Sequence, residues 1–461
     1  MALSKVNEEQ VIVPEEKYQA LLRSLRRTKG FGILFVQCSP AEANNLITKI
    51  KQDLPRKKIE VLMLEESIDN LYEIIDRRSD RDELNVLFIQ GIEKSLEAYI
   101  KPGYGGQGDY YKLDTVPQIL NHLNQQRENF RDHFSNICFV FVVPLFALKY
   151  FIHRAPDFFD WRSGVFAFPM DPKLVEKESL RVISSRDYRE NLKLDPHQQH
   201  KLLEIRQLLE EKYQTPILRA ELLHKQGQIF DAAQNYEEAI ASYDKALTIQ
   251  PDNYGVWISR GETLRKLERY EEAIASYDKA LTIQPDNYWA WTSRGQALNS
   301  LGRYEEAIAS CDKALTIQPD DHWAWDSRGQ ALNSLGRYEE AVASYNKAIK
   351  IQPDDYWPWI FRGQALNNLG RYEEAISSYN KALAIQPEAY WAWTSKGEAF
   401  RKLERHKEEI ASYDKALEIQ PDYSWTWYSR GEVLGKLGRH REEKTNLERS
   451  LELDKSDDNH S

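Results

Sequence analysis

Cysteine is scarce in this sequence: Cys38, Cys138 and Cys311 are the three cysteines among 461 residues, and they lie far apart. Such spacing favours neither a disulfide framework nor a zinc site. Long apolar runs are missing as well, because the nearest, residues 136–148, falls short of the ~20 residues that span a bilayer and contains Pro144. The first ten residues show no basic segment followed by an apolar one. We therefore expect no signal peptide, no membrane partner and a cytoplasmic location.

An excess of basic residues is also absent. The formal net charge is −10, with 32 basic and 32 acidic side chains in residues 1–219 and 30 basic and 40 acidic ones in residues 220–461. Nucleic-acid-binding proteins concentrate positive charge on one face, so the acidic second half argues against a nucleic-acid partner. With 41% hydrophobic and 29% charged residues the composition is that of a globular protein, and the length predicts two or three structural units.

What the second half does contain is a period of 34 residues. Trp257 is followed by a tryptophan every 34 residues up to Trp427, and a glycine stands four residues after each of them. Leu223 and Gly227 hold the equivalent positions one period earlier, and a proline stands near the end of nearly every unit. A period of this size is typical of stacked helical repeats. The seven units begin at Ala220, Tyr254, Tyr288, His322, Tyr356, Tyr390 and Ser424.

Each unit has the pattern of two helices. In the third unit Trp291, Gly295 and Leu298 share one helical face, and a second helical pattern follows until Pro319 ends it. Such a unit cannot bury its apolar face alone, so we expect the seven units to stack into a superhelical array. Near the end of the array, acidic residues at Glu409 and Glu443 replace a small residue, which we interpret as a solvent-facing cap.

These units resemble the tetratricopeptide repeat (TPR). The resemblance implies an all-α array over residues 220–457, with a polar tail at 458–461, that serves protein–protein interaction. One departure is an Arg or Lys just before each later glycine, as at Arg260 and Lys396, where leucine is usual. In the second unit the matching residues are Trp257, Gly261, Leu264, Ala273, Tyr277, Ala280 and Pro285.

Five units carry an additional tryptophan two positions before the periodic one. Residues two apart on a helix point about 200° away from each other, so both cannot enter the same core. We assign the core to the periodic tryptophan and predict that the earlier one projects from the opposite side, with residues three, seven and ten further on within roughly 80° of it. In the resembled family this side of the first helix is the concave surface that contacts ligands. The predicted partner-binding row is Trp289, Trp323, Trp357, Trp391, Trp425, Gln296, Gln330, Gln364, Asn299, Asn333 and Asn367.

Two interpretations of this row remain open. Tryptophan is enriched at binding hot spots and amides pair with an extended peptide backbone, which favours a groove for a protein or peptide. The alternative is that the additional tryptophans pack between adjacent first helices as reinforcement. The positions three residues after them hold no basic side chain, which argues against a carboxylate clamp for acidic chaperone tails: Thr292, Asp326, Ile360, Thr394 and Tyr428.

The first half has a different pattern. Apolar runs at 31–38, 59–64, 84–90, 136–143 and 164–169 alternate with helical patterns at 40–53, 67–77, 114–130 and 145–155. Strands this apolar are usually buried on both faces, so we predict an α/β domain with a parallel sheet over residues 28–170. A helical segment at 1–27 precedes it, and a helical connector at 171–219 leads to the array.

This order resembles P-loop nucleoside triphosphatases, especially the bacterial signal-transduction ATPases of the STAND/AAA type that carry repeats. The phosphate loop itself is missing, because the first run is followed by QCSPAEANN, without glycine or lysine, and Gln90 stands where a metal-holding aspartate is expected. We therefore interpret residues 28–170 as a degenerate, inactive relative used for docking or self-association. We predict no catalytic, cofactor-binding or metal-binding residues.

The sequence thus favours a non-enzymatic adaptor that captures a partner with its repeats. Two alternatives remain: a signalling switch that binds a nucleotide through non-standard residues, and a non-catalytic subunit of an enzyme complex.

Overall fold

The computed structural model describes residues 14–38, 40–97, 116–168, 170, 172–185, 196–211 and 213–458. Residues 1–13 of the predicted N-terminal segment and 459–461 of the predicted tail lie outside this description. The chain forms two compact units, Met1–Pro251 and Asp252–Ser461. In the described ranges, no helix is both long and apolar enough to cross a membrane.

The first unit contains a five-stranded sheet in the order β2-β3-β4-β1-β5, and every pairing in it is parallel. The predicted parallel sheet is therefore confirmed, and each strand lies within or overlaps one of the predicted apolar runs. The strands are β1 Gly32–Gln37, β2 Ile59–Met63, β3 Val86–Gln90, β4 Cys138–Val143 and β5 Arg162–Ala167.

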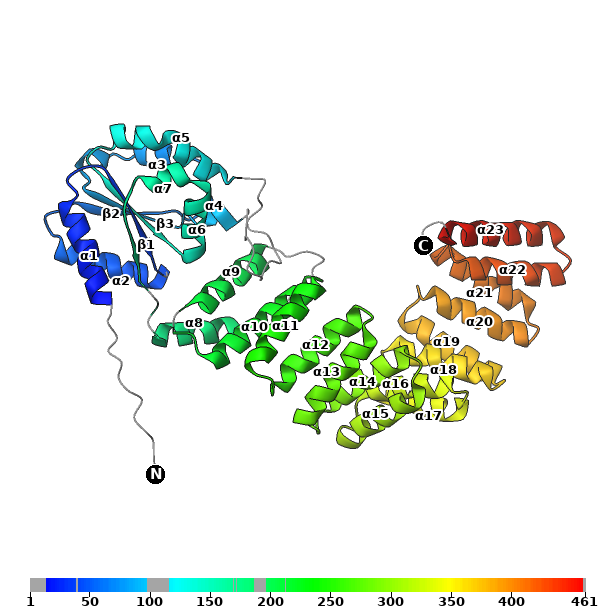
Figure 1. The fold of residues 1–461 in the computed structure, drawn as a ribbon. Helices are drawn as coiled ribbons and strands as arrows, with labels where there is room; N and C mark the ends of the chain where they lie inside the picture. The colour runs from blue at the N-terminus through cyan, green and yellow to red at the C-terminus, as the bar shows by residue number, and fades with distance from the viewer. Residues whose placement is uncertain are drawn as a thin grey trace, which may run out of the picture. The chain divides into compact units, whose positions relative to one another are not determined.

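Helices cover both faces of this sheet (Figure 1). Leu21 of α1 and Ile47 of α2 share a buried cluster with Val140 of β4, whereas Phe130 of α5 and Phe151 of α6 share another with Phe141. Neighbouring residues of one strand point to opposite faces, so β4 contributes to both clusters. The helices are α1 Pro14–Arg27 and α2 Pro40–Asp53 on one face and α3 Leu71–Asp76, α5 Gln118–His133, α6 Leu145–Arg154 and α7 Pro156–Asp160 on the other; η1 Arg81–Glu83 and α4 Lys94–Glu97 are short connecting turns.

At the carboxyl ends of β1 and β3 the structure places Cys38 and Gln90. Burial raises the pKa of the Cys38 thiol at the end of β1 to about 12, so it is not a thiolate at neutral pH. Gln90 ends β3 in a buried position, and Gly91 follows with φ of 86°, where a Cβ atom would lie 2.2 Å from the Leu64 carbonyl oxygen. Glycine is thus required here by the close approach of two backbones.

Four helices complete the first unit: α8 Pro172–Ser184, α9 Pro196–Glu210, α10 Pro216–Ala232 and α11 Tyr236–Ile249. Helix α10 packs against α11 and also contacts α8 and α9. The first repeat therefore packs against α8 and α9.

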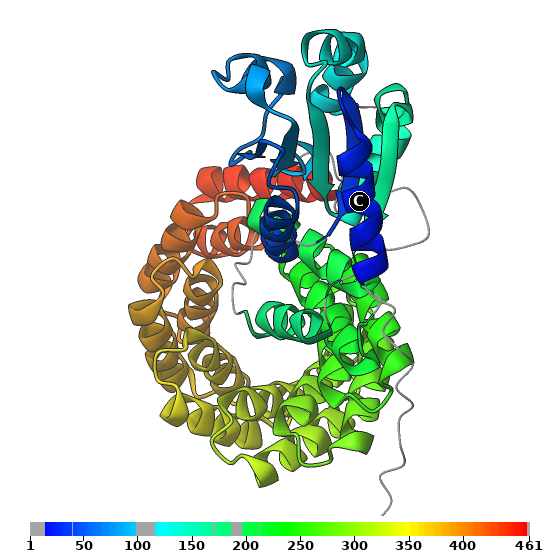
Figure 2. The same cartoon turned by 90° about the vertical axis from the view of Figure 1, so that its left-hand side faces the viewer.

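The second unit is a run of helix pairs that follows one arc (Figure 2). The first helix of each pair begins at the start predicted for its repeat. In four pairs the side chain of the preceding Asn or Asp accepts a hydrogen bond from the first turn, as Asn287 does from the Ala290 N–H. The helices are α12 Tyr254–Lys266, α13 Tyr270–Ile283, α14 Tyr288–Ser300, α15 Tyr304–Ile317, α16 His322–Ser334, α17 Tyr338–Ile351, α18 Tyr356–Asn368, α19 Tyr372–Ile385, α20 Tyr390–Lys402, α21 His406–Ile419, α22 Ser424–Lys436 and α23 His440–Asp458.

In four repeats the arginine before the repeat glycine ties three helices together, which explains the departure from leucine there: Arg294, Arg328, Arg362 and Arg430. Arg328 Nε donates to Asp312 Oδ1 of α15 at 2.7 Å, and its Nη1 donates to Ser344 Oγ of α17 at 2.8 Å. The same guanidinium lies over the ring of Trp325. Leucine would fill this position but could not link the preceding second helix to the following one.

The expected solvent-facing cap is wrong for Glu409. This side chain is fully buried, and its Oε2 lies 3.0 Å from His406 Nδ1. The reason is that α22 still follows and contacts α21, so the sixth repeat has a neighbour on both sides. Burial raises the pKa of Glu409, while His406 opposes the shift.

Candidate functional site

The first helices of the repeats approach one another along the second unit. Helix α14 contacts α16, and contacts also join α12 with α14, α16 with α18 and α18 with α20. Because successive first helices contact one another, the array curves toward the side on which they lie. The surface formed by the first helices is therefore the inner one, as the TPR resemblance implies.

The periodic tryptophans reach the predicted core in part, because Trp291 and Trp325 pack against the buried cluster of Ala314, Leu315 and Ala324. Trp291 and Trp325 are half-buried, and their Nε1 atoms donate to the carbonyl oxygens of Pro285 and Pro319, each at 2.9 Å. Alanine fills the fully buried position just before each of them, as Ala324 does. Each indole therefore covers part of the core and, through its N–H group, also holds the loop that enters its helix.

Four of the five additional tryptophans are exposed. The exposed fractions are 42% for Trp289, 43% for Trp323, 38% for Trp357 and 47% for Trp425, whereas Trp391 is half-buried. Large side chains with this much exposed apolar surface in one row are unusual for a surface without a partner.

Part of the row packs against itself. The rings of Trp357 and Trp391 are stacked, with centroids 5.3 Å apart and planes at 8°, and Phe361 stacks on Trp357 at 5.6 Å. The Trp425 ring stacks on Tyr428, and its Nε1 donates to Glu398. In the fifth to seventh repeats, reinforcement between and within first helices therefore accounts for much of the indole surface.

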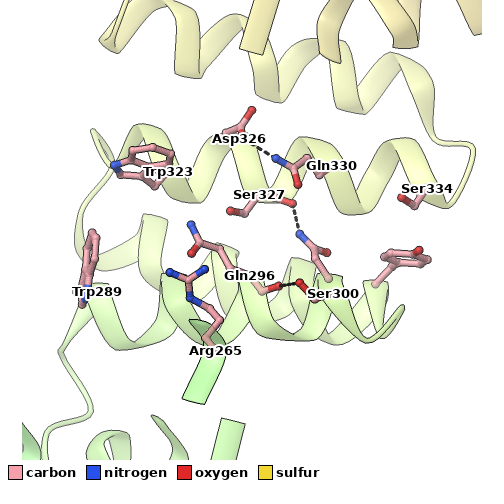
Figure 3. Close-up of a pocket in the computed structure, with 11 residues that line it drawn as sticks. Arg265, Trp289, Gln296, Ser300, Trp323, Asp326, Ser327, Gln330 and Ser334 are labelled. Atoms are coloured by element: carbon pink, nitrogen blue, oxygen red, sulfur yellow. Dashed lines mark hydrogen bonds between the residues drawn. The ribbon is translucent and has the colours of Figure 1, made fainter. Parts of the chain in front are cut away.

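The third and fourth repeats are different, because a groove of about 530 Å³ opens between α14 and α16 (Figure 3). Trp289 and Trp323 stand at one end of it, one on each helix. From α14 the Gln296 side chain extends toward α16, where Gln330 also faces the groove. We call this feature the groove of α14 and α16. Its lining residues are Arg265, Trp289, Gln296, Asn299, Ser300, Tyr304, Trp323, Asp326, Ser327, Gln330 and Ser334.

The predicted asparagines are engaged within the array. Asn299 Nδ2 donates to the Ser327 carbonyl oxygen of α16 at 2.7 Å, which ties the two walls of the groove together. The Oδ1 atoms of Asn299, Asn333 and Asn367 are buried and, among the described residues, accept no hydrogen bond. Gln364 is half-buried on α18. Of the predicted amides, Gln296 and Gln330 are the ones that the structure brings beside two exposed indoles.

Asp326 and Arg265 also line the groove, although the predicted site did not include them. Asp326 is 6% exposed; Gln330 Nε2 donates to its Oδ2 at 2.7 Å, and its Oδ1 has no hydrogen-bond partner among the described residues. Burial raises the pKa of Asp326 to about 7, and the neighbouring Asp355 adds to the shift. A carboxylate at a position that holds Thr or Ile in other repeats was the sequence signal for it.

The position three residues after each of the first four additional tryptophans is buried rather than exposed, whereas Tyr428 of the seventh repeat is 39% exposed. Thr292, the equivalent of Asp326 in the third repeat, donates its hydroxyl hydrogen to Asp321 Oδ2 at 2.6 Å, and Thr394 bonds Thr426 at 2.9 Å. The helical wheel placed these residues on the open row. It failed because each first helix packs against the neighbouring first helices as well as against its own second helix.

Comparison with known proteins supports the repeat assignment. Models of the tetratricopeptide repeat match residues 224–288, 258–322, 329–370, 360–424 and 412–445. The second half of the chain therefore carries tetratricopeptide repeats.

In the part that the structure describes, no three His, Cys, Asp or Glu side chains gather as a metal site would require.

Several solved structures are similar to part of this chain. A tetratricopeptide repeat protein from Parabacteroides merdae is 17% identical, and the match covers 61% of this chain and 98% of that one with a TM-score of 0.43. YrrB, described as a TPR protein with an unusual peptide-binding site, is 23% identical over 41% of this chain and 97% of its own, with a TM-score of 0.36. MamA from Desulfovibrio magneticus is 21% identical over 37% and 96%, with a TM-score of 0.35. No curated protein matches the chain.

Proposed function

We propose that this chain is a non-catalytic adaptor that holds an extended segment of a partner protein in the groove of α14 and α16. Tetratricopeptide repeats generally mediate protein–protein interactions, and residues 224–445 carry them. The observation that carries the proposal is the exposure of Trp289 and Trp323, 42% and 43%, at the end of a groove.

The chemistry of the groove suits a peptide backbone with side chains. Exposed indoles offer large apolar faces and one N–H donor each, and burying them against a partner supplies most of the free energy at many interfaces. The amides of Gln296 and Gln330 can both donate to and accept from an extended backbone. The groove therefore combines apolar anchors with hydrogen-bonding groups that fix orientation.

The walls of the groove are held in place before any partner arrives. Asn299 bonds the backbone of α16, and Thr292 bonds Asp321 at the start of α16. Both bonds join α14 to α16, so the two tryptophans keep a fixed spacing. Preorganisation of this kind lowers the entropy lost on binding.

For the α/β domain, we propose a docking or self-association role as a degenerate relative of signal-transduction ATPases. This proposal is supported by the parallel sheet and by the lack of a glycine-rich loop with lysine after β1. The adaptor would then capture one protein with its repeats and attach to another through residues 28–170.

The test is capture of partners from the source organism by the full chain, compared with the double variant Trp289→Ala, Trp323→Ala. We expect the double variant to lose the proteins that the wild type retains, with little change in its melting temperature, because both indoles are exposed. Ile317→Ala is the matched control, since Ile317 is 37% exposed on the second helix α15 and does not line the groove.

Quantitative mass spectrometry of the retained proteins provides the readout. An unchanged set of partners in the double variant would place binding elsewhere. A large fall in its melting temperature would instead support the reinforcement interpretation of the row.

A further inference from the structure

The array repeats one arrangement of three groups: an indole, a guanidinium and a carboxylate. In the fourth repeat the Arg328 guanidinium carbon lies 5.9 Å from the ring centroid of Trp325, and Arg328 Nε donates to Asp312 at 2.7 Å. The third repeat has the same geometry with Trp291, Arg294 and Asp278. The chain thus repeatedly stabilises an arginine between an aromatic face and a carboxylate.

The groove of α14 and α16 holds two of these three groups. Trp323 and Asp326 lie three residues apart on α16, and both line the groove with Trp289. Among the described residues no cation lies over the ring of Trp289 or Trp323, unlike the rings of the periodic tryptophans. What the groove lacks among the described residues is a cation stacked on these two rings.

Asp326 is the second, independent observation that indicates a ligand. The residue is 6% exposed, and its Oδ1 accepts no hydrogen bond among the described residues. A buried carboxylate with an unsatisfied oxygen costs free energy unless a donor satisfies it. A cationic donor from a partner would remove this cost and add a charge-assisted hydrogen bond.

The second unit as a whole is acidic, and one basic and one acidic side chain line the groove. Residues 252–461 hold 28 basic and 35 acidic side chains. Arg265 is the cation that lines the groove, and its Nη2 donates to Glu262 Oε2 at 3.0 Å on the same helix. Since Arg265 is paired, the uncompensated charge in the groove is the carboxyl group of Asp326.

We infer that the groove accepts an arginine side chain from the partner segment, stacked on the indoles of Trp289 and Trp323 and donating to Asp326. This inference rests on the proposed function and names the chemistry of its partner. Arginine fits better than lysine because its planar guanidinium can stack on an aromatic ring and donate to a carboxylate at the same time. Since Oδ1 is covered in the unliganded chain, the Asp326 side chain turns toward the groove on binding.

Binding of arginine is coupled to the ionisation of Asp326. Of the titratable groups on the neighbouring helices, Asp355 at the start of α18 raises the pKa of Asp326. The Asp326 carboxylate in turn raises the pKa of Tyr345 on α17 and of Cys311 on α15. Burial and Asp355 raise the pKa of Asp326 to about 7, so part of the population is protonated at neutral pH. A bound guanidinium favours the carboxylate, so binding releases a proton and strengthens as the pH rises from 6 to 8.

The experiment uses the full chain and three capped Gly/Ser peptides of about nine residues that contain arginine, lysine or glutamate at the same three positions. Isothermal titration calorimetry in two buffers of different ionisation enthalpy measures both affinity and proton release. We expect the arginine peptide to bind most tightly and the glutamate peptide least, with about three- to tenfold tighter arginine binding at pH 8 than at pH 6.

The variants Asp326→Asn and Trp323→Ala separate the two contacts. Each is expected to weaken arginine binding about tenfold, and Asp326→Asn also abolishes its pH dependence. Asp320→Asn is the matched control, because it removes the same charge from an exposed loop residue outside the groove and should change the affinity less than about twofold. Circular dichroism melting checks that each variant is folded.

Equal binding of the lysine and arginine peptides, or arginine binding that Asp326→Asn leaves unchanged, would overturn the inference. The adaptor function would survive that result if the double variant Trp289→Ala, Trp323→Ala still loses its captured partners. Failure of the capture experiment with intact arginine binding would instead count against the adaptor and leave the arginine site in place.

Discussion

At the scale of single residues, Asp326 is the side chain whose burial most clearly opposes folding. Its pKa is raised in the folded chain to about 7, well above the ~3.9 expected in an unfolded chain. The unfolded state therefore loses this proton at lower pH than the folded state does. The free energy of unfolding therefore falls as the pH rises from about 4 to about 7 and then stays at its lower value. This direction is the one expected for a carboxyl group whose pKa is raised by folding.

Asp326→Asn should remove this penalty, since an amide needs no deprotonation and keeps the bond with Gln330. We expect the variant to match the wild type near pH 4 and to exceed it by on the order of 4 kcal/mol at pH 7.5. Thermal unfolding followed by circular dichroism across this range measures the difference. Parallel pH curves for the two proteins would show that Asp326 ionises normally.

Some residues of the groove could be predicted from the sequence, and others could not. The additional tryptophans were visible as a WxW motif, and four of the five are exposed as the predicted row requires, whereas Trp391 is half-buried. Arg265 was missed because it comes from α12, whose repeat has Gly255 in place of the additional tryptophan. No pattern within one repeat shows which side chain of a neighbouring repeat enters its groove.

At the scale of the elements, each helix pair depends on a close approach at its glycine. A Cβ atom built on Gly329 would lie 2.6 Å from Cε1 of Tyr345 on the partner helix, and Tyr345 is fully buried. The glycine therefore lets a large aromatic ring fill the space between the two helices. This packing is the physical reason for the Gly and Tyr positions of the repeat.

Gly329→Ala tests this close approach against helix propensity. Alanine favours a helix over glycine by about 1 kcal/mol, but overpacking costs about 1–3 kcal/mol, and we expect the net effect to be destabilising. Gly255→Ala is the control on α12, because its added Cβ would meet Asn253 Oδ1 at 3.4 Å and nothing closer. Chemical denaturation should show a loss for the first variant and no loss for the second; equal behaviour would contradict the packing argument.

At the scale of the whole chain, two units with different chemistry are joined. Met1–Pro251 contains the parallel sheet, and Asp252–Ser461 consists of helix pairs. The described carboxyl ends of β1 and β3 present Cys38 and Gln90, neither of which neutralises a polyphosphate. The nucleotide-responsive switch therefore requires binding groups other than those of a P-loop.

Millimolar Mg–ATP or Mg–GTP should leave the melting temperature of the full chain within about 1 °C of its value without nucleotide. The reason is linkage: a ligand that does not bind the folded state cannot stabilise it. Differential scanning fluorimetry is the measurement, with Mg²⁺ alone as the control. A rise of several degrees would favour the switch over the adaptor.

The sequence by itself determined the repeat period, the starts of the first helices and the strands of the sheet. These features depend on local signals, namely caps, prolines, glycines and hydrophobic periodicity. Tertiary structure decided which side chains are open: it buried Thr292 and Asp326 between first helices, left the periodic Trp291 half-exposed and stacked Trp357 on Trp391. The physical reason is that a helical wheel assumes one buried face, whereas each first helix in this array packs on its own second helix and on both neighbouring repeats.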